Sequence, residues 1–190
     1  MLAQLINTST QTTIHLDALR LDGGTQPRDG LNTAYVTELA QSLQDGAALP
    51  PIDVMHDGAN YWLFDGFHRV AAHRKANILI IPATIHQGDQ AAAQWRSYAA
   101  NQTHGLRRTN DDKKRAILAA LRHPNAATLS NREIGRHLDV DHKTIATYRE
   151  QLQATGEIPS QTQRTGADGR TIDTTNIGVK PAPVCYIMNN

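Results

Sequence analysis

Residues 61–69 read YWLFDGFHR, an apolar run that ends at Asp65-Gly66 and continues into a pattern typical of a helix. Such a strand-to-helix turn is a place where an anion can bind. The first backbone N–H groups of a helix have no partner within it, and the helix dipole favours negative charge there. Gly66 lets the backbone approach a ligand, and the guanidinium of Arg69 suits phosphate. The structural alternative is that Gly66 only makes a turn and that Arg69 pairs with an acid.

The residues around this turn predict alternating strands and helices. Residues 32–44 have the apolar spacing of a helix, with Asn32 as its N-cap and Gly46 just past its end. Strands are expected at 14–21, 52–55, 61–64 and 78–85, and further helices at 67–76 and 90–101. This order indicates a small α+β or α/β unit over residues 14–101, after a flexible N-terminus at residues 1–13.

The composition excludes several classes of protein. The chain has 190 residues, which is enough for one ordinary domain or two small ones. Its single cysteine, Cys185, excludes an internal disulfide and a zinc finger, and fits a reducing cytoplasm. No run of about twenty apolar residues is present to cross a membrane. Residues 1–13 lack the features of a secretion signal, so a cytoplasmic protein is expected.

Charge is distributed unevenly along the chain. Residues 1–100 carry six Lys and Arg against nine Asp and Glu, whereas residues 101–190 carry thirteen against nine. This asymmetry suggests that the second half contacts a polyanion, although a solvated basic face would give the same count.

Residues 130–152 predict two short helices joined by a tight turn. Ser130 and Glu133 have the spacing of a capping box, and Asp141 can cap the second helix. Such a pair is typical of a helix-turn-helix whose second helix enters the major groove; the alternative is an ordinary helical hairpin. The residues expected to contact DNA are Arg132, Arg136 and Arg149 at phosphates, and His142, Lys143, Thr144 and Thr147 at base edges.

The helical part extends on both sides of this pair. A preceding helix is capped by Thr109 and ends at His123-Pro124, so the predicted DNA-binding unit covers residues 102–156. A polar tail follows at residues 157–190. Within it, the Gly and Asp residues of 164–170 indicate a tight turn between two short extended pieces, which would form a hairpin.

The nine histidines of the chain do not predict a metal site. His68 and His73 are five residues apart, a spacing that does not place them on one helix face. His137 and His142 lie on opposite sides of the predicted turn, and neither pair has a carboxylate at a suitable spacing.

Several separated segments together resemble ParB-type partition proteins and related regulators. They are residues 25–28 (TQPR), 65–69, 101–115 and the helix pair, and the resemblance covers roughly residues 14–155. It implies an α+β ParB/sulfiredoxin-like domain followed by an all-α helix-turn-helix domain, in a short form of phage or plasmid type. It also implies sequence-specific binding of double-stranded DNA, for partition or transcription regulation, by a protein associated with the nucleoid or a plasmid. A homodimer is left open.

The same resemblance implies a pocket for a nucleotide such as CTP with magnesium, which would gate DNA binding. Two positions depart from the family pattern. Phe67-His68 replaces a glutamate and an arginine, and Ala100 replaces a glutamate, so that little remains to hold magnesium or to order a water. Nucleotide binding without turnover, or a pocket with another ligand, is therefore expected, and weak CTPase activity is left open. The residues carried over to the pocket are Gln26, Arg28, Asp65, Gly66, His68, Arg69 and Asn101.

The form Asp-Gly-aromatic-His-Arg also resembles the free-serine kinases and, more distantly, the sulfiredoxins. No cysteine lies in this turn, which excludes sulfiredoxin chemistry. A nucleotide-dependent phosphotransferase remains the alternative, with His68 and Arg69 positioning the phosphoryl group and Asp65 or Glu38 as the base. Such an enzyme would have no use for a helix-turn-helix.

Overall fold

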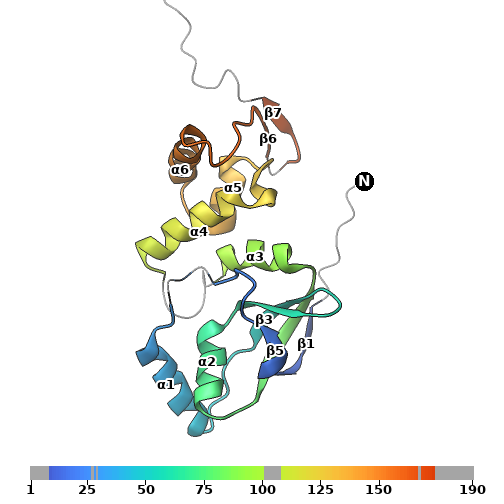
Figure 1. Ribbon diagram of the computed structural model, residues 1–190, viewed down its shortest axis with the longest axis vertical. Coiled ribbons are helices and arrows are strands. Elements are labelled where there is room, and N and C mark those ends of the chain that lie inside the picture. Colours follow the sequence, from blue (N-terminus) through green and yellow to red (C-terminus); the bar gives the residue numbers. More distant parts are fainter. Residues whose placement is uncertain (1–8, 27, 29, 101–107, 167, 174–190) are drawn as a thin grey trace, which may run out of the picture.

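The computed structural model describes residues 9–26, 28, 30–100, 108–166 and 168–173. These residues form two parts that lie one above the other along the long axis of the molecule (Figure 1). The N-terminal part contains a five-stranded sheet, and the second part contains helices α4–α6 and a small hairpin. Helix α3 lies between the two parts (Figure 1).

The sheet is mixed, which confirms the α+β prediction. Its strands are ordered β1-β5-β3-β4-β2. The pairs β1/β5 and β3/β4 are antiparallel, whereas β3/β5 and β2/β4 are parallel. The strands are β1 (Thr10–His15), β2 (Leu19–Arg20), β3 (Ile52–His56), β4 (Tyr61–Asp65) and β5 (Ile80–Gln87).

Helices cover both faces of this sheet because its central strands are apolar on both sides. On one face, Ile52, Leu63 and Ile81 pack with Val70 of α2 (Phe67–Lys75). On the other face, an apolar cluster includes Met55, Trp62, Phe64 and Ala93 of α3 (Gln90–Ala99). Helix α1 (Thr33–Gln44) packs on α2, and Asn32 caps it as predicted, with its side chain accepting from the N–H of Tyr35.

The prediction of one strand at residues 14–21 was wrong, and residues 10–13, predicted as part of the flexible N-terminus, belong to β1; residues 1–8 of that segment lie outside the described residues. Strand β1 begins at Thr10, and a short 3-10 helix (Leu16–Ala18) separates it from β2. Because β1 lies at the edge of the sheet, only one of its six residues, Ile14, is buried. A strand without an apolar face leaves no alternation in the sequence.

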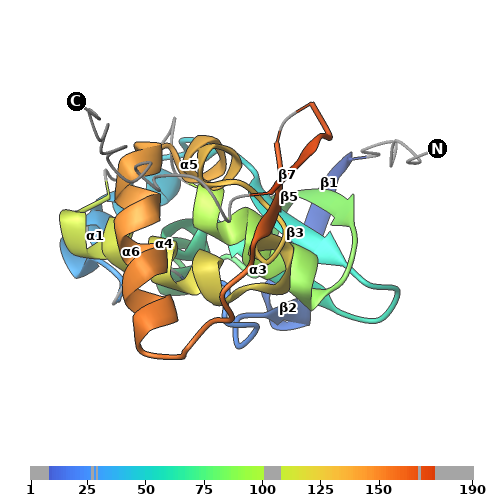
Figure 2. The same cartoon turned by 90° about the horizontal axis from the view of Figure 1, so that it is seen from above.

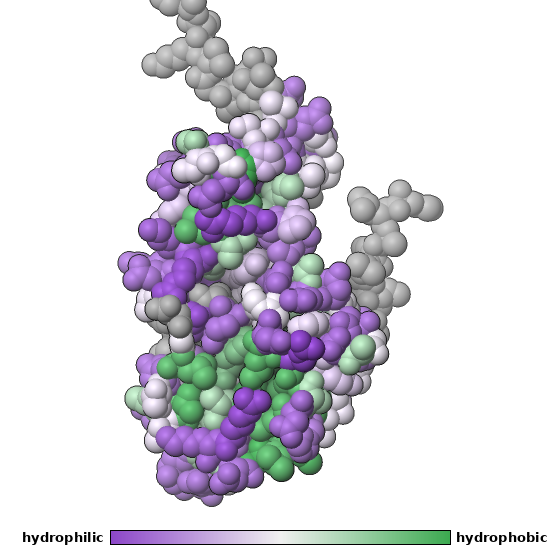
Figure 3. Space-filling model, in the orientation of Figure 1, coloured by the Kyte–Doolittle hydropathy of each residue, from purple (hydrophilic) through white to green (hydrophobic). Residues whose placement is uncertain are grey.

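The second part is built from three helices. They are α4 (Asn110–Arg122), α5 (Asn131–Leu138) and α6 (His142–Ala154), with a 3-10 turn (Pro124–Ala126) after α4. Thr109 caps α4 as predicted and forms a complete capping box with Asp112. In the view of Figure 3, hydrophilic residues dominate this part, whereas apolar residues gather over the N-terminal part. Among the described residues, no helix has the length and apolar character to cross a membrane.

Helix α3 belongs to both cores and so joins the two parts. Trp95 lies between two histidines of the helical part: the ring of His137 stacks on it at 4.3 Å, and the ring of His123 lies at 5.4 Å. The His137 Nε2 lies 2.8 Å from the Trp95 carbonyl oxygen, and the His123 Nε2 lies 3.1 Å from that of Ala91. In both histidines Nε2 therefore carries a proton and donates to α3, and in His123 the Nδ1 accepts from the N–H of Asn125, so that ring is neutral.

We expect this junction to weaken in mild acid. Burial lowers the pKa of both His123 and His137 below the ordinary histidine value, and the charge of Arg108 lowers that of His137 further. Below about pH 6.5 the unfolded chain takes up protons that the folded rings refuse, so stability falls as the pH falls. Urea unfolding at pH 7.5 and 5.5 measures this loss. Replacing both histidines with glutamine should reduce it, whereas replacing the exposed His142 should not; an equal loss in all three proteins would contradict the assignment.

Candidate functional site

The turn between β4 and α2 requires glycine at position 66. Gly66 has φ +106°, a left-handed conformation that side chains disfavour. A Cβ atom there would also lie 2.5 Å from Cγ2 of Ile52 in the core of the sheet. The carbonyl of Gly66 accepts the first helical hydrogen bond of α2, from the N–H of Val70. The N-terminus of α2 is therefore held against the sheet without a capping side chain.

Arg69 is engaged in structural contacts. Its guanidinium donates to Asp65 Oδ2 at 2.6 Å, and it also donates to the carbonyls of Pro50 and Pro51. Burial raises the pKa of the Asp65 carboxyl above its usual value, although the charge of Arg69 acts in the opposite direction. The structural alternative for Arg69, pairing with an acid, is thus present, and the predicted phosphate contact would require Arg69 to exchange partners.

His68 faces the loop that precedes α1. Its Nε2 accepts from the backbone N–H of Asn32 at 3.0 Å, and its ring meets Tyr35 edge to face at 5.5 Å. Burial, and then the charge of Arg28, hold the pKa of His68 below its ordinary value. His68 is therefore neutral near pH 7, with its proton on Nδ1.

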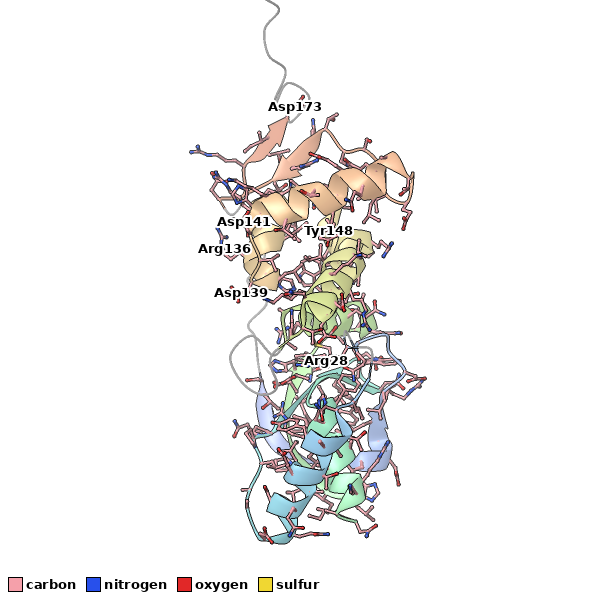
Figure 4. The ribbon with its side chains drawn as sticks, turned by 90° about the vertical axis from the view of Figure 1, so that its left-hand side faces the viewer. Arg28, Arg136, Asp139, Asp141, Tyr148 and Asp173 are labelled. Atoms are coloured by element: carbon pink, nitrogen blue, oxygen red, sulfur yellow. The ribbon has the colours of Figure 1, made fainter. Side chains whose placement is uncertain are left out.

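Arg28 links this turn to the helical part. Its guanidinium lies 3.6 Å from Asp112 Oδ2, and only 8% and 9% of the two side chains are exposed. Asp112 is also the residue whose carboxylate completes the capping box of α4. Figure 4 shows Arg28 at the level where the two parts of the molecule meet. A buried ion pair of this kind costs several kcal/mol to break by removing one partner, about 3–5 kcal/mol in typical proteins.

Arg108 is a further arginine near this site, and it interacts electrostatically with Arg28. It donates to the carbonyl of Tyr98 at 2.6 Å and to that of Ala100. Burial, followed by the charge of Arg28, lowers the pKa of Arg108. Arg28 lowers the pKa of both His68 and Arg108, so its positive charge acts on both sides of the loop that precedes α1. Positive charge of this kind favours an anion.

The described carboxylates at this site do not fit a magnesium ion. Asp65 is held by Arg69, and Asp112 by Arg28 and the backbone N–H of Thr109. Ala100 stands where the family pattern has a glutamate and presents no carboxylate. Within the ranges that the structure describes, no three His, Cys, Asp or Glu side chains gather so as to hold a metal ion.

The other two residues predicted to line the pocket are Gln26 and Asn101. Gln26 is half-buried in the loop before Arg28, and the neighbouring Thr25 is buried, its hydroxyl donating to the carbonyl of Leu63. Asn101 lies outside the described residues.

A cavity of about 300 Å³ lies next to Asp65, between the sheet, α3 and α5. Across its wall, Arg96 donates to Nδ1 of His86 at 2.8 Å, and the Nε2 of His86 lies 3.0 Å from Asp53. The two strand-end carboxylates face each other across β3 and β4, and Asp53 contributes to the raised pKa of Asp65. The cavity is lined by Asp53, Phe64, Asp65, His86, Arg96, Ala99, Ala100 and His137.

The helix pair α5–α6 has a tight, well-defined turn. Asp139 adopts a left-handed conformation with φ +55°, and the N–H of Val140 donates to the carbonyl of Gly135. Ser130 caps α5 by accepting from the N–H of Glu133. The second half of the predicted capping box is not formed, because Glu133 pairs with Arg136 and the N–H of Ser130 donates to Thr165.

We expect Gly135→Ala to destabilise the protein by about 1–3 kcal/mol, because an added methyl overpacks this turn. Its Cβ would lie 2.7 Å from the carbonyl oxygen of Val140, a backbone atom that cannot move alone. The gain in helix propensity, up to about 1 kcal/mol, does not offset that clash. Chemical denaturation measures the change. Gly30→Ala is the matched control, since nothing lies within 4 Å of its added methyl; equal stability of both variants would refute this packing argument.

The first turn and the outward face of α6 present the predicted base-reading residues to solvent. His142, Lys143, Thr144 and Thr147 are all exposed, whereas Ile145 and Leu152 on the same helix are buried. Arg132 is exposed on α5, and 65% of the Arg136 side chain is exposed beside Glu133. Figure 4 shows Arg136, Asp139 and Asp141 along one side of the helical part.

Arg149 is buried, and the prediction of a phosphate contact there was wrong. Only 4% of the residue is exposed, and its guanidinium donates to the carbonyls of Ala126 and Leu129. Burial lowers its pKa to about 10. Arg149 thus closes the turn between α4 and α5 from inside, and Tyr148 is the half-exposed neighbour.

The sequence patterns did not single out Arg108 and Asp112 as site residues. Both residues entered the prediction only as members of the segment 101–115 that carries the family resemblance. The sequence does contain one signal, which is charge. Arg108 is a cation just before α4, and Asp112 is an anion in the first turn of α4.

Comparison with known proteins places these features in a family. Residues 3–101 match the family described as the ParB N-terminal domain. The chain is 32% identical to a possible regulatory protein of the streptomycin biosynthesis operon of Streptomyces griseus, over 74% of this chain and 38% of that protein. It is 32% identical to the transcriptional regulator NovG of Streptomyces niveus, over 76% of this chain and 42% of that protein. The chain therefore spans about two fifths of the length of these relatives.

A solved structure shows the same fold. It is the C-terminally truncated chromosome-partitioning protein ParB from Caulobacter crescentus, complexed to the centromeric parS site. The TM-score is 0.51 at 16% sequence identity, and the match covers 77% of this chain and 79% of that chain. At this identity the likeness concerns the fold.

Proposed function

Because the chain belongs to the ParB N-terminal domain family, we propose that it is a DNA-binding regulator whose affinity for DNA depends on a nucleotide at the Gly66 turn. The observation that carries this proposal is the exposed first turn of α6, on a helix pair whose inward residues Ile134, Leu138, Ile145 and Leu152 are buried. Both curated relatives are regulatory proteins by name, which favours transcription regulation over partition. Association with the nucleoid or a plasmid would follow from DNA binding.

In this proposal the pair α5–α6 acts as a helix-turn-helix. The first turn of α6 would enter the major groove, where His142, Lys143 and Thr144 would reach base edges. Arg132 and Arg136 on α5 would contact phosphates and fix the orientation of the protein on the duplex. The solved relative is complexed to a DNA site, which agrees with this use of the fold.

The nucleotide would act through Arg28. An anion bound by Arg28, His68 and the N-terminus of α2 would compete with Asp112 for the guanidinium of Arg28. Since Asp112 caps α4, the competition would change how α4 and the helices packed on it are held against the N-terminal part. A ligand shifts such an equilibrium only by its different affinities for the two arrangements, and the Arg28 contact supplies that difference.

We propose CTP as the nucleotide, bound without turnover. The carboxylates near the turn are neutralised by arginines, and position 100 is alanine. No observation on the described residues favours the phosphotransferase: Asp65 is paired with Arg69, and Glu38 lies exposed on α1.

Calorimetric titration of the full chain with CTP, ATP and ADP, each with and without a random-sequence 30-base-pair duplex, tests the proposal. We expect the chain to bind the duplex, with an affinity that falls steeply as salt rises, and to bind CTP more tightly than ATP or ADP. Phosphoryl transfer from ATP without duplex affinity at physiological salt would overturn the proposal in favour of the phosphotransferase.

A further inference from the structure

A two-stranded hairpin follows α6 and is fixed to α5 through its first strand. Strand β6 (Gln163–Thr165) pairs antiparallel with β7 (Thr171–Asp173). The N–H of Thr165 donates to the carbonyl of Thr128 at 2.7 Å, and the N–H of Ser130 donates to that of Thr165 at 2.9 Å. Because Ser130 also caps α5, the position of the hairpin is fixed relative to that of α5. A hairpin this short is marginal in water alone, so its position depends on this docking.

The two arginines of the hairpin are placed differently. Arg164, at the base, is half-buried, and its charge contributes to the lowered pKa of the buried Arg149. Arg170, just after the tip, exposes 85% of its side chain. Its Nε lies 3.5 Å from Asp168 Oδ2, which is itself 59% exposed. An ion pair this exposed is weak, so Arg170 remains available to a stronger acceptor such as phosphate.

Backbone hydrogen bonds tie Gly169 and Arg170 to the end of strand β6. The N–H of Gly166 donates to the carbonyl of Arg170 at 3.0 Å, and the N–H of Gly169 donates to that of Gly166 at 3.0 Å. Gly169 has φ +75°, the left-handed conformation that closes this turn. The outer strand β7 buries nothing: all three of its residues are exposed, including 52% of Ile172.

The tip lies on the same side of the helical part as the beginning of α6. Seen from above, the first turn of α6, helix α5 and the tip of the hairpin follow one another along a single edge (Figure 2). The side view agrees, with the hairpin above the side that carries Arg136 and Asp141 (Figure 4). An element beside a helix that lies in the major groove faces the phosphates at the border of that groove.

We propose that the β6–β7 hairpin is a second DNA-contacting element, in which Arg170 binds a backbone phosphate next to the groove that α6 occupies. This inference rests on the proposed function, because it assumes that α6 contacts DNA. It assigns the hairpin a positioning role: a phosphate contact adds affinity for every sequence and carries no base preference.

Binding of a fluorescent random-sequence 30-base-pair duplex to the full chain, measured by anisotropy between 50 and 200 mM NaCl, tests the hairpin. One phosphate contact contributes about 0.9 to the slope of log affinity against log salt. Arg170→Ala should therefore lower the affinity about five- to tenfold near 100 mM salt and reduce that slope by about one. Arg170→Lys should keep the slope. The matched control is Arg74→Ala, an exposed arginine on α2 that should bind as the wild type does.

The outcomes separate this inference from the proposed function. A wild-type chain that does not bind the duplex refutes DNA binding itself. A wild-type chain that binds, with Arg170→Ala equal to Arg74→Ala in affinity and slope, refutes only the hairpin. A loss for Arg170→Ala that is confined to A·T-rich duplexes would also refute the phosphate contact, since it would mean reading of the minor groove.

Discussion

The variant Lys143→Ala/Thr144→Ala is expected to lose about 2–4 kcal/mol of binding to a duplex selected by the wild-type chain, roughly a thirty- to thousandfold loss of affinity. Both side chains are exposed in the first turn of α6, where a recognition helix contacts base edges. Each base contact that is lost costs about 1–3 kcal/mol, because the base is left without its partner. Anisotropy titrations with the selected duplex and with a random one measure the effect.

The two duplexes distinguish reading of sequence from simple charge attraction. On the random duplex, the double variant should lose only the affinity that one positive charge contributes. The ratio of its affinities for the selected and the random duplex should therefore fall towards one. Gln151→Ala is the matched control, because Gln151 is exposed further along the same helix. Truncating exposed side chains leaves the buried face of α6 intact, so thermal unfolding should be unchanged. Equal losses on both duplexes would show that α6 is not the recognition helix.

The parts of the fold that depend on local patterns were predictable from the sequence. The capped helix at Thr109, the turn with a left-handed Asp139 and the glycine turn at Gly66 all leave short-range signals, and the structure has each of them. The split of residues 14–21 into two edge strands was missed because β1 and β2 are held by pairing with distant strands.

The roles of individual arginines were less predictable than the elements that carry them. Arg149 was predicted to contact a phosphate, whereas its guanidinium donates to the carbonyls of Ala126 and Leu129. Arg69 has the type and position of a phosphate ligand, yet it pairs with Asp65 and donates to two carbonyls in the loop before β3. The carbonyls that hold Arg149, and two of the three acceptors of Arg69, are backbone oxygens, which leave no trace in residue identity.

The Arg28–Asp112 ion pair, which links the two parts, was missed for a similar reason. Arg28 and Asp112 are distant in the sequence, and each has a sufficient local role, one in a loop and one in a capping box. They come within 3.6 Å of each other, and both are buried, because the loop between β2 and α1 meets α4 in the folded protein. The pair is therefore the feature of the site that most needs an experimental test.

Asp112→Asn is expected to tighten CTP binding about five- to tenfold and to remove most of the dependence of DNA affinity on CTP. The asparagine can still accept from the N–H of Thr109, so the cap of α4 is kept while the attraction for Arg28 is lost. Arg28→Ala should instead weaken CTP binding about ten- to hundredfold, because a charged phosphate contact disappears. Calorimetry of CTP binding, with and without the duplex, measures both effects.

Thermodynamic linkage requires that the effects of Asp112→Asn on CTP binding and on DNA binding agree. If CTP changes the affinity for DNA by some factor, DNA must change the affinity for CTP by the same factor, typically about 5–150-fold in coupled systems. In Asp112→Asn both factors should fall together to within about twofold of one, since the contact that distinguishes the two arrangements is gone. Asp111→Asn is the control, as its carboxylate is exposed in the same turn of α4. If Asp112→Asn retains the wild-type coupling, the signal does not pass through Arg28; if Arg28→Ala binds CTP normally, the nucleotide does not bind at the Gly66 turn.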